Sequence, residues 1–327
     1  MDVRPRAHDQ NRRAAVSGPL FITGHAGLAG SALRRAMPGR DIITASRGEL
    51  DLKNADAVAA FLQHHRPSAI IHAAARNAGI TLHEAEPAAL LADNLAIAVN
   101  VIRAAADARV PRLLYISSAV VYAAADTQPL AETCAATTLP GGPTAGYALA
   151  KIAGMALCEA VRKQHGLTFH SIIPCNLYGP GDNYHPQHAT VVAGMMRRMH
   201  QAAHTSAPEF PIWGSGRQTR EFLHADDLAA ACLLLLDRSA PPPRVNCSPG
   251  ISTAMFEIAD HLKAVTGYTG TLVPDSSKPE GAPRPPLDCT LIRSLGWQPR
   301  IALPDGLCST YAAFNAAIHA GNLRGAQ

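Results

Sequence analysis

Apolar residues in the first half of the chain alternate between short continuous runs and segments with helical spacing. Short apolar strands separated by amphipathic helices are typical of a parallel sheet covered on both faces. The predicted strands are Pro19–Thr23, Asp41–Ser46, Ser68–Ala75, Arg112–Ser118 and Phe169–Pro174. The predicted helices are Ser31–Ala36, Ala55–His64, Asn94–Ala108 and Tyr147–His165. Because crossovers between parallel strands are right-handed, this order predicts an α/β fold with a doubly wound sheet.

Beyond Tyr178 the pattern changes, since Pro, Gly and His become frequent and the periodic segments become shorter. Loops are predicted at Ala203–Pro211 and Ser239–Pro243, and a surface loop at Lys278–Pro286. We expect a second, smaller, C-terminal domain that carries most of the substrate contacts. The predicted boundaries are a tail at 1–16, a first domain at 17–178 that also receives about 215–250, and a second domain at 179–327.

Composition supports a globular protein and narrows its partners. The 327 residues contain 47% hydrophobic and 17% charged side chains, with a formal charge of +4 that is spread along the chain. We therefore expect neither nucleic-acid binding nor a membrane-spanning segment. The seven cysteines are scattered and form no CxxC pair, which predicts reduced thiols in the cytoplasm and no metal site.

A glycine-rich segment follows the first predicted strand and opens the first predicted helix. Its glycines are Gly24, Gly27 and Gly30, in a GxxGxxG spacing. Glycines at such a turn let the backbone approach a pyrophosphate at the helix N-terminus, so they indicate a Rossmann dinucleotide site. A glycine turn that only packs strand against helix is the alternative.

The end of the second predicted strand indicates which dinucleotide is bound. An acidic residue there would hold the ribose hydroxyls of NAD, but the chain has Arg47, which suits a 2′-phosphate. We therefore predict NADP(H), while a solvated surface position for Arg47 remains the alternative. Asp51 and Leu52 are placed to contact the adenine, and the small side chain of Ala73 leaves room for the cofactor.

Tyr147 and Lys151 form a YxxxK pair on one face of a predicted helix. A tyrosine with an ordinary pKa near 10 is a poor acid–base group at neutral pH, so we expect the ammonium and an oxidised nicotinamide to lower its pKa. Ser118 ends a predicted strand at the carboxyl edge, where such sheets bind ligands. Its hydroxyl can donate a hydrogen bond to a carbonyl oxygen that is being reduced.

These motifs carry a family resemblance. GxxGxxG, the SSxxxY segment from Ser117 to Tyr122, and YxxxK resemble the extended short-chain dehydrogenase/reductase superfamily. The segments YALAKIAGMALCEA, NLYGPGDNYHP and REFLHADDLA are similar, more narrowly, to the GDP-L-fucose synthase family, and the similarity runs from about Pro19 to Phe314. The resemblance implies that Ser118, Tyr147 and Lys151 are the reductase residues. It assigns nucleotide-sugar contacts to Asn176, Arg198, Trp213, Arg220 and Lys278, although a core position for Trp213 is an equal alternative.

The chain departs from the family at the epimerase residues. The family uses a cysteine two residues after the catalytic serine and a histidine near the start of the following helix to move protons at C3 and C5. These positions fall on Val120 and Thr190, which are poor proton-transfer groups. His185 and His188 lie nearby in sequence, and His188 is the stronger candidate for a replacement.

The resemblance, with these departures, implies an NADPH-dependent 4-reductase of a GDP-4-keto-6-deoxy hexose or heptose. Similarity to heptose reductases that lack the epimerase pair favours a heptose, and such products feed capsule or lipopolysaccharide synthesis. A homodimer is expected through Asn94–Ala108 and Ala148–His165. The alternatives are a bifunctional 3,5-epimerase/4-reductase that uses His188, and a catalytically silent NADP-binding protein.

Overall fold

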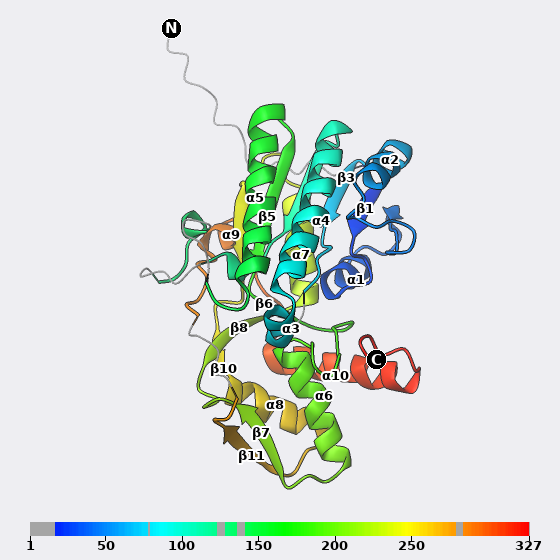
Figure 1. The fold of residues 1–327 in the computed structure, drawn as a ribbon. Coiled ribbons are helices and arrows are strands. Elements are labelled where there is room, and N and C mark those ends of the chain that lie inside the picture. The colour runs from blue at the N-terminus through cyan, green and yellow to red at the C-terminus, as the bar shows by residue number, and fades with distance from the viewer. Residues whose placement is uncertain (1–16, 78, 123–127, 136–140, 279–283, 327) are drawn as a thin grey trace.

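A six-stranded parallel sheet forms the larger part of the molecule (Figure 1). The computed structural model describes residues 17–77, 79–122, 128–135, 141–278 and 284–326. The strands lie in the order β2-β1-β3-β4-β5-β9 and all neighbours are parallel. Their bounds are β1 Leu20–Thr23, β2 Ile42–Ile43, β3 Ala69–His72, β4 Arg112–Ile116, β5 Thr168–Pro174 and β9 Arg244–Cys247. The predicted α/β doubly wound fold is confirmed.

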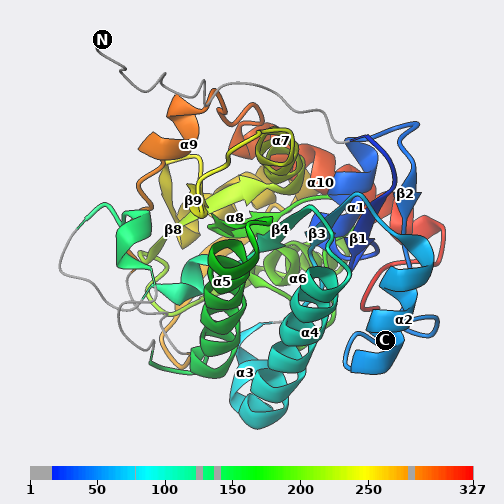
Figure 2. The ribbon, with the colours of Figure 1, turned by 90° about the horizontal axis from the view of Figure 1, so that it is seen from above.

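Helices cover both faces of this sheet, as the view from above shows (Figure 2). Helix α4 packs between α2 and α5 on one face, and α1 packs against α7 on the other. The bounds are α1 Leu28–Arg35, α2 Ala55–His65, α4 Pro87–Asp107, α5 Ala145–His165 and α7 Ala225–Leu236. Because both faces are covered, β1 and β3 are buried at every position, which explains their unbroken apolar runs.

Several predicted boundaries were wrong. The second strand has two paired residues, Ile42–Ile43, because only these lie alongside β1. Helix α4 begins at Pro87 rather than at Asn94, since proline is well suited to the first helical position. The predicted loop at Ala203–Pro211 contains the end of one helix and the start of a strand, whose apolar residues face the second core.

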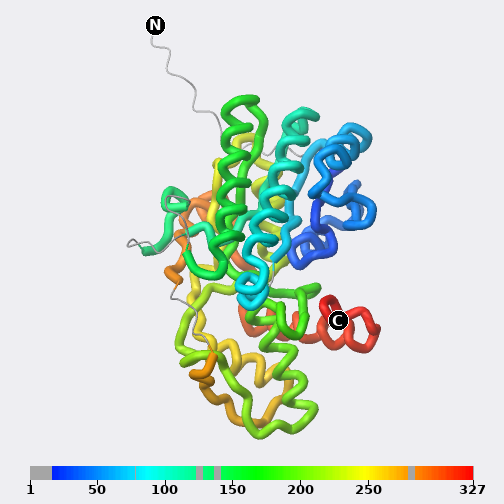
Figure 3. The backbone as a smooth tube through the Cα atoms, viewed as in Figure 1, coloured from blue at the N-terminus to red at the C-terminus, as the bar shows by residue number. Residues whose placement is uncertain are grey.

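The smaller part of the molecule lies below the carboxyl ends of the large sheet, and the tube in Figure 3 follows the chain into it from β5. It contains a three-stranded sheet ordered β10-β8-β6 and the parallel pair β11 and β7. These strands are β6 Asn176–Tyr178, β7 Glu209–Trp213, β8 Thr219–His224, β10 Ser252–Ala254 and β11 Thr271–Asp275. The remaining helices are α3 Ile80–Ala85, α6 Val191–His204, α8 Met255–Thr266, α9 Thr290–Ser294 and α10 Leu303–His319, and two short 3₁₀ turns are η1 Ala119–Val121 and η2 Glu132–Cys134.

The chain crosses repeatedly between two separate buried apolar clusters. One lies around the large sheet and includes residues from α7 and β9 and the stretch around Trp297. The other lies among α6, α8 and α10. The two parts are therefore interleaved in sequence rather than joined by one linker.

A glycine lets α5 approach the sheet closely. A Cβ atom at Gly154 would fall on the ring of Tyr115 in β4, at 2.5 Å from Cζ. The residue at this point of the helix therefore has to be glycine for the ring to remain where it is. This contact fixes α5, and with it Tyr147 and Lys151, against the strand that leads to Ser118.

Helix α4 is long and apolar enough to cross a membrane by length and composition alone. It is the one helix among the described residues that meets this test, which core helices of soluble proteins also meet. In the fold, α4 packs against α2 and α5, and Val101 and Ile102 are fully buried.

Candidate active site

The strand order of the large sheet reverses direction between β1 and β3, and open α/β sheets bind ligands at such a point. A hydrogen-bonded pair joins the two strand ends there. The Thr23 hydroxyl lies 2.6 Å from Nδ1 of His72 and accepts the Ala74 amide at 3.1 Å. Burial, with a smaller contribution from the charge of Lys151, lowers the pKa of His72 to about 3. Neutral His72 therefore shares a hydrogen bond with Thr23, and this bond holds the two strand ends side by side.

The glycine segment forms a tight cradle between β1 and α1. A Cβ at Gly24 would lie 2.8 Å from Cα of Ala74, and a Cβ at Gly30 would lie 2.7 Å from Cα of His25. Gly24 also has a positive φ of 68°, which favours glycine. Gly27 is the N-cap residue of α1. The cradle therefore fits a dinucleotide pyrophosphate, which needs close backbone approach at a helix N-terminus.

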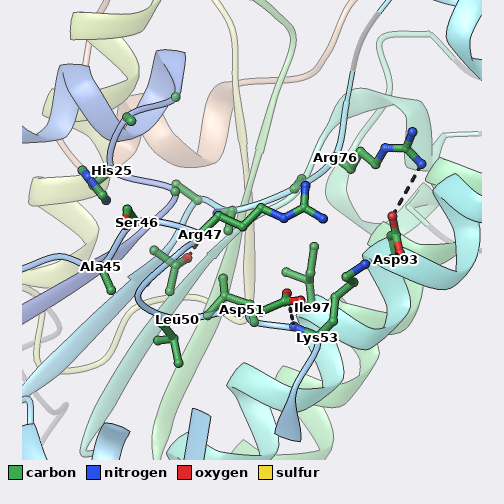
Figure 4. A pocket seen from close by; sticks show the side chains of 18 of the residues that line it. His25, Ala45, Ser46, Arg47, Leu50, Asp51, Lys53, Arg76, Asp93 and Ile97 are labelled. Atoms are coloured by element: carbon green, nitrogen blue, oxygen red, sulfur yellow. Dashed lines mark hydrogen bonds and ion pairs between the residues drawn. The ribbon is translucent and has the colours of Figure 1, made fainter. Parts of the chain in front are cut away.

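A cavity of about 410 Å³ opens beside this cradle (Figure 4). The predicted cofactor residues Arg47, Asp51, Leu52 and Ala73 all line it. Arg47 is exposed to solvent, and its side chain extends above Asp51 at this cavity (Figure 4). The cavity therefore also fits the adenosine end of NADP(H), because a guanidinium is available where the 2′-phosphate would need one.

Arg76, which no motif in the sequence indicated, brings a second guanidinium to this cavity (Figure 4). It forms ion pairs with Glu86 and Asp93. Buried Asn94 holds the loop in place, because its amide accepts the Arg76 backbone N–H at 2.8 Å and donates to the Arg76 carbonyl at 2.9 Å. The signal in the sequence for this contact was Asn94 itself, a polar residue among apolar neighbours in a predicted helix.

A second cavity, of about 380 Å³, contains the predicted reductase residues. Ser118, Tyr147 and Lys151 all line it, although they come from the turn after β4 and from α5. Lys151 donates from Nζ to the carbonyl oxygen of Ile116 at 2.8 Å, and Nζ lies 5.6 Å from the ring centre of Tyr147. The two side chains therefore meet on one face of α5, as the spacing predicted.

Burial dominates the pKa values of both members of the YxxxK pair in this cavity. Burial lowers the pKa of Lys151 to about 7, and burial raises the pKa of Tyr147 above its ordinary value rather than lowering it. The physical reason is that both groups lose water, so the lysine is itself partly neutral near pH 7. A phenol with a raised pKa keeps its proton, which suits an acid that protonates a developing alkoxide.

The two positions that the family resemblance assigns to epimerisation lie at this same cavity. Val120 and Thr190 are both among its lining residues. Thr190 is the N-cap residue of α6, and its hydroxyl donates to Asp182 at 3.5 Å. His188 does not line the cavity; its ring stacks on His185 with centres 4.4 Å apart.

Three further ionisable side chains line the cavity and were not predicted. His83 of α3 is buried, with Nε2 3.1 Å from Oδ1 of Asn77 and its ring centre 5.6 Å from that of Tyr147. Cys175 follows β5, and burial raises the pKa of its thiol far above the usual range. Burial also raises the pKa of Asp182 to about 6. His83 followed from no motif, because helix α3 itself was not predicted, and the NLYGPGDNYHP segment contains Asp182 without indicating a role for it.

A third cavity, of about 270 Å³, adjoins the second and shares Gly79, Ile80, Thr190 and Val191 with it. Its lining includes Arg198, Trp213 and Arg220, three of the five predicted substrate residues. Trp213 is 37% exposed, so it is not the core aromatic that the alternative required.

Cations lie against the indole of Trp213 at the edge of this third cavity. The Arg198 guanidinium lies 5.7 Å from a Trp213 ring centre, and Nζ of Lys278 lies 5.8 Å from it. Asn176, in contrast, lines the second cavity and donates to the Glu221 carbonyl at 3.0 Å. The predicted substrate residues therefore lie in two adjoining cavities and at the edge of one of them.

Arg284 is an additional cation at the site that no motif in the sequence indicated. It lines the second cavity, while Arg220 lines the third. Burial and, to a smaller extent, the charge of Arg220 lower the pKa of Arg284. Two partly buried guanidiniums that repel each other favour the binding of an anion between them. The diphosphate of a nucleotide sugar is such an anion.

Comparisons with known proteins identify the family of this chain. Residues 20–248 match the NAD dependent epimerase/dehydratase family. GDP-L-fucose synthase 1 of Arabidopsis thaliana is 40% identical over 298 residues, which cover 90% of this chain and 92% of that protein. The GDP-L-fucose synthase of Escherichia coli K12 is 38% identical over 307 residues, covering 90% and 96%. The solved structure of MlghC, a GDP-mannoheptose C4 reductase from Campylobacter jejuni with NADP bound, has a TM-score of 0.80 and 28% identity, covering 92% and 99%. The chain therefore belongs to the GDP-L-fucose synthase family, within the NAD dependent epimerase/dehydratase family.

Proposed function

We propose that the protein is an NADPH-dependent 4-reductase of a GDP-4-keto-6-deoxy sugar that does not epimerise C3 or C5. The observation that carries this proposal is the content of one cavity. Ser118, Tyr147 and Lys151 line it together, and so do Val120 and Thr190 at the family's epimerase positions. The groups that support ketone reduction are thus present, whereas valine has no exchangeable proton and a threonine hydroxyl is a very poor base.

NADPH, when bound, supplies a hydride to the carbonyl carbon. Tyr147 donates its proton to the oxygen at C4, and its raised pKa keeps that proton available at neutral pH. Ser118 donates a hydrogen bond to the same oxygen. Lys151, which donates to the Ile116 carbonyl and lies beside Tyr147, would hold the cofactor ribose.

The substrate class follows from the relatives and from the cations of the third cavity. The two curated relatives described above are GDP-L-fucose synthases, and MlghC is a GDP-mannoheptose C4 reductase. Arg198, Arg220 and Trp213 suit a nucleoside diphosphate, because guanidiniums bind phosphates and an indole stacks on a base or sugar. A 6-deoxy-heptose or a hexose is proposed as the sugar.

Turnover in heavy water tests the proposal. GDP-4-keto-6-deoxy-mannose is incubated with the protein and NADPH in D₂O, and the product is examined by NMR. Reduction without deuterium at C3 or C5 is the expected result. Inertness toward this hexose together with turnover of the GDP-4-keto-6-deoxy-heptose would assign the heptose, and inertness toward both would refute the reductase.

The bifunctional epimerase/reductase is the second candidate, and His83 and Cys175 favour it, because they bring an imidazole and a thiol to the same cavity. Deuterium at C3 or C5 that disappears in His83→Asn or Cys175→Ala would establish this candidate. His188→Asn is the matched control, since His188 stacks on His185 away from the cavity lining.

The proposal extends to a cytoplasmic homodimer that serves capsule or lipopolysaccharide synthesis. Helices α4 and α5 lie side by side on one face, and Leu149 of α5 is 37% exposed. All seven cysteines are free, which suits a reducing compartment. Light scattering after gel filtration tests the dimer, and Leu149→Glu should shift it to a monomer.

A further inference from the structure

The two cavities that flank the glycine cradle meet at a small set of residues. Gly27, Ala73, Ala75 and Arg324 line both the first and the second cavity. Three of these residues have little or no side chain. Arg324 is the one charged residue that the two cavities share within the described chain, and it comes from the C-terminal segment that follows α10.

The C-terminal segment is held in place by specific contacts. Arg324 donates from Nη1 to the Gly181 carbonyl at 3.0 Å, and its own carbonyl accepts the Tyr184 amide at 2.9 Å. Gly325 has a φ of 78° and packs so closely on Asn183 that a side chain would not fit. Figure 1 shows this segment below α1, on the side of the cradle. These contacts place Arg324 at the junction of the first and second cavities, although most of the chain separates it from the cradle in sequence.

The junction lies between a cavity suited to an adenosine 2′-phosphate and a cavity that contains the reductase residues. A dinucleotide that reaches both has its pyrophosphate between them, at the N-terminus of α1. A guanidinium matches two phosphate oxygens better than any other side chain. Asp182 also faces Arg324, whose charge opposes the larger effect of burial on the pKa of Asp182.

We propose that Arg324 binds the pyrophosphate of the cofactor, so that the C-terminal segment forms part of the dinucleotide site. This inference rests on the proposed NADPH-dependent function. It assigns Arg324 and Arg47 to different phosphates. Arg324 acts on the group that NADPH and NADH share, and Arg47 acts on the 2′-phosphate that NADPH alone carries.

Binding measured by quenching of protein fluorescence tests this division. Arg324→Gln is expected to weaken NADPH and NADH by the same factor of about ten, which is typical of one charge-assisted hydrogen bond. Arg47→Gln is expected to weaken NADPH alone. Arg324→Lys should retain most of the affinity. Arg34→Gln, an exposed residue of α1 that lines neither cavity, is the matched control and should change neither affinity.

A second pair of probes separates pyrophosphate binding from support of the fold. ADP-ribose contains the pyrophosphate, whereas adenosine 2′-monophosphate does not. Arg324→Gln should weaken ADP-ribose about tenfold and leave adenosine 2′-monophosphate unchanged. Unchanged NADPH binding, or equal losses for both probes, would overturn the inference. A wild-type protein that binds neither dinucleotide would overturn the proposed function, and this inference with it.

Discussion

Acid should destabilise the protein in a way that can be traced to one buried histidine. His170 lies in the middle of β5 and is fully buried, and burial lowers its pKa from an ordinary 6.5 to about 3. The Thr168 backbone opposes this shift to a smaller extent, and the charges of Arg162 and Arg112 add to it. The unfolded chain therefore binds a proton first as the pH falls. The stability associated with neutral His170 is complete above about pH 6.5, decreases below it, and stops decreasing near pH 3.

The size of this effect follows from the two pKa values. At pH 5 the unfolded histidine is almost fully protonated and the folded one is not, which costs about 2 kcal/mol relative to pH 8. His72 should add a similar loss, while Asp182, whose pKa burial raises to about 6, acts in the opposite direction. The contribution of His170 is isolated by comparing wild type with His170→Leu, because the other groups cancel in the difference.

The assay is the free energy of unfolding in urea at pH 8, 7, 6 and 5, at one protein concentration. His170→Leu should lose about 2 kcal/mol less than wild type between pH 8 and pH 5. The exposed His64→Gln variant is the matched control and should follow the wild-type profile. If the His170→Leu profile also runs parallel to wild type, burial does not keep this histidine neutral and the reasoning is refuted.

Three further predictions concern the site. Tyr147→Phe should lower kcat by a factor of about 10² to 10⁴ while NADPH affinity stays within about twofold, because only the proton donor is removed; an unchanged kcat would exclude Tyr147 as the acid. Trp213→Ala and Arg198→Ala should each raise KM for the GDP-sugar about tenfold with a smaller change in kcat, since they remove stacking and a cation from the third cavity; steady-state kinetics measures both. Gly154→Ala should lower the free energy of unfolding by about 1–3 kcal/mol, because its methyl group would displace the Tyr115 ring; thermal unfolding measures the loss, and an unchanged Tm would show that α5 shifts freely.

The sequence predicted the parts of the site that depend on local spacing. Gly24 and Gly30 come directly from a turn between strand and helix, and Tyr147 and Lys151 from one helical repeat. Strand-end positions such as Ser118 also follow, because parallel strands share one carboxyl edge. These features need no knowledge of how distant segments pack.

The residues that were missed depend on such packing. His83 lies on a short helix with a weak pattern, and Arg324 reaches the cradle only through contacts with Gly181 and Tyr184. The burial that raises the pKa of Tyr147 also could not be read from its neighbours in sequence. Long-range contacts and desolvation account for these differences.

The interleaving of the two apolar clusters has a consequence for how this protein can be altered. Strand β9 and the stretch around Trp297 complete the core around the large sheet, yet segments of the smaller part precede each of them. A fragment ending near Tyr178 would leave one edge of β5 unpaired, with the backbone groups of Ser171 and Ile173 open to self-association. Substrate preference in this protein is therefore best redesigned by changing individual loops and side chains, because no single chain break separates the smaller part as a domain that could be exchanged.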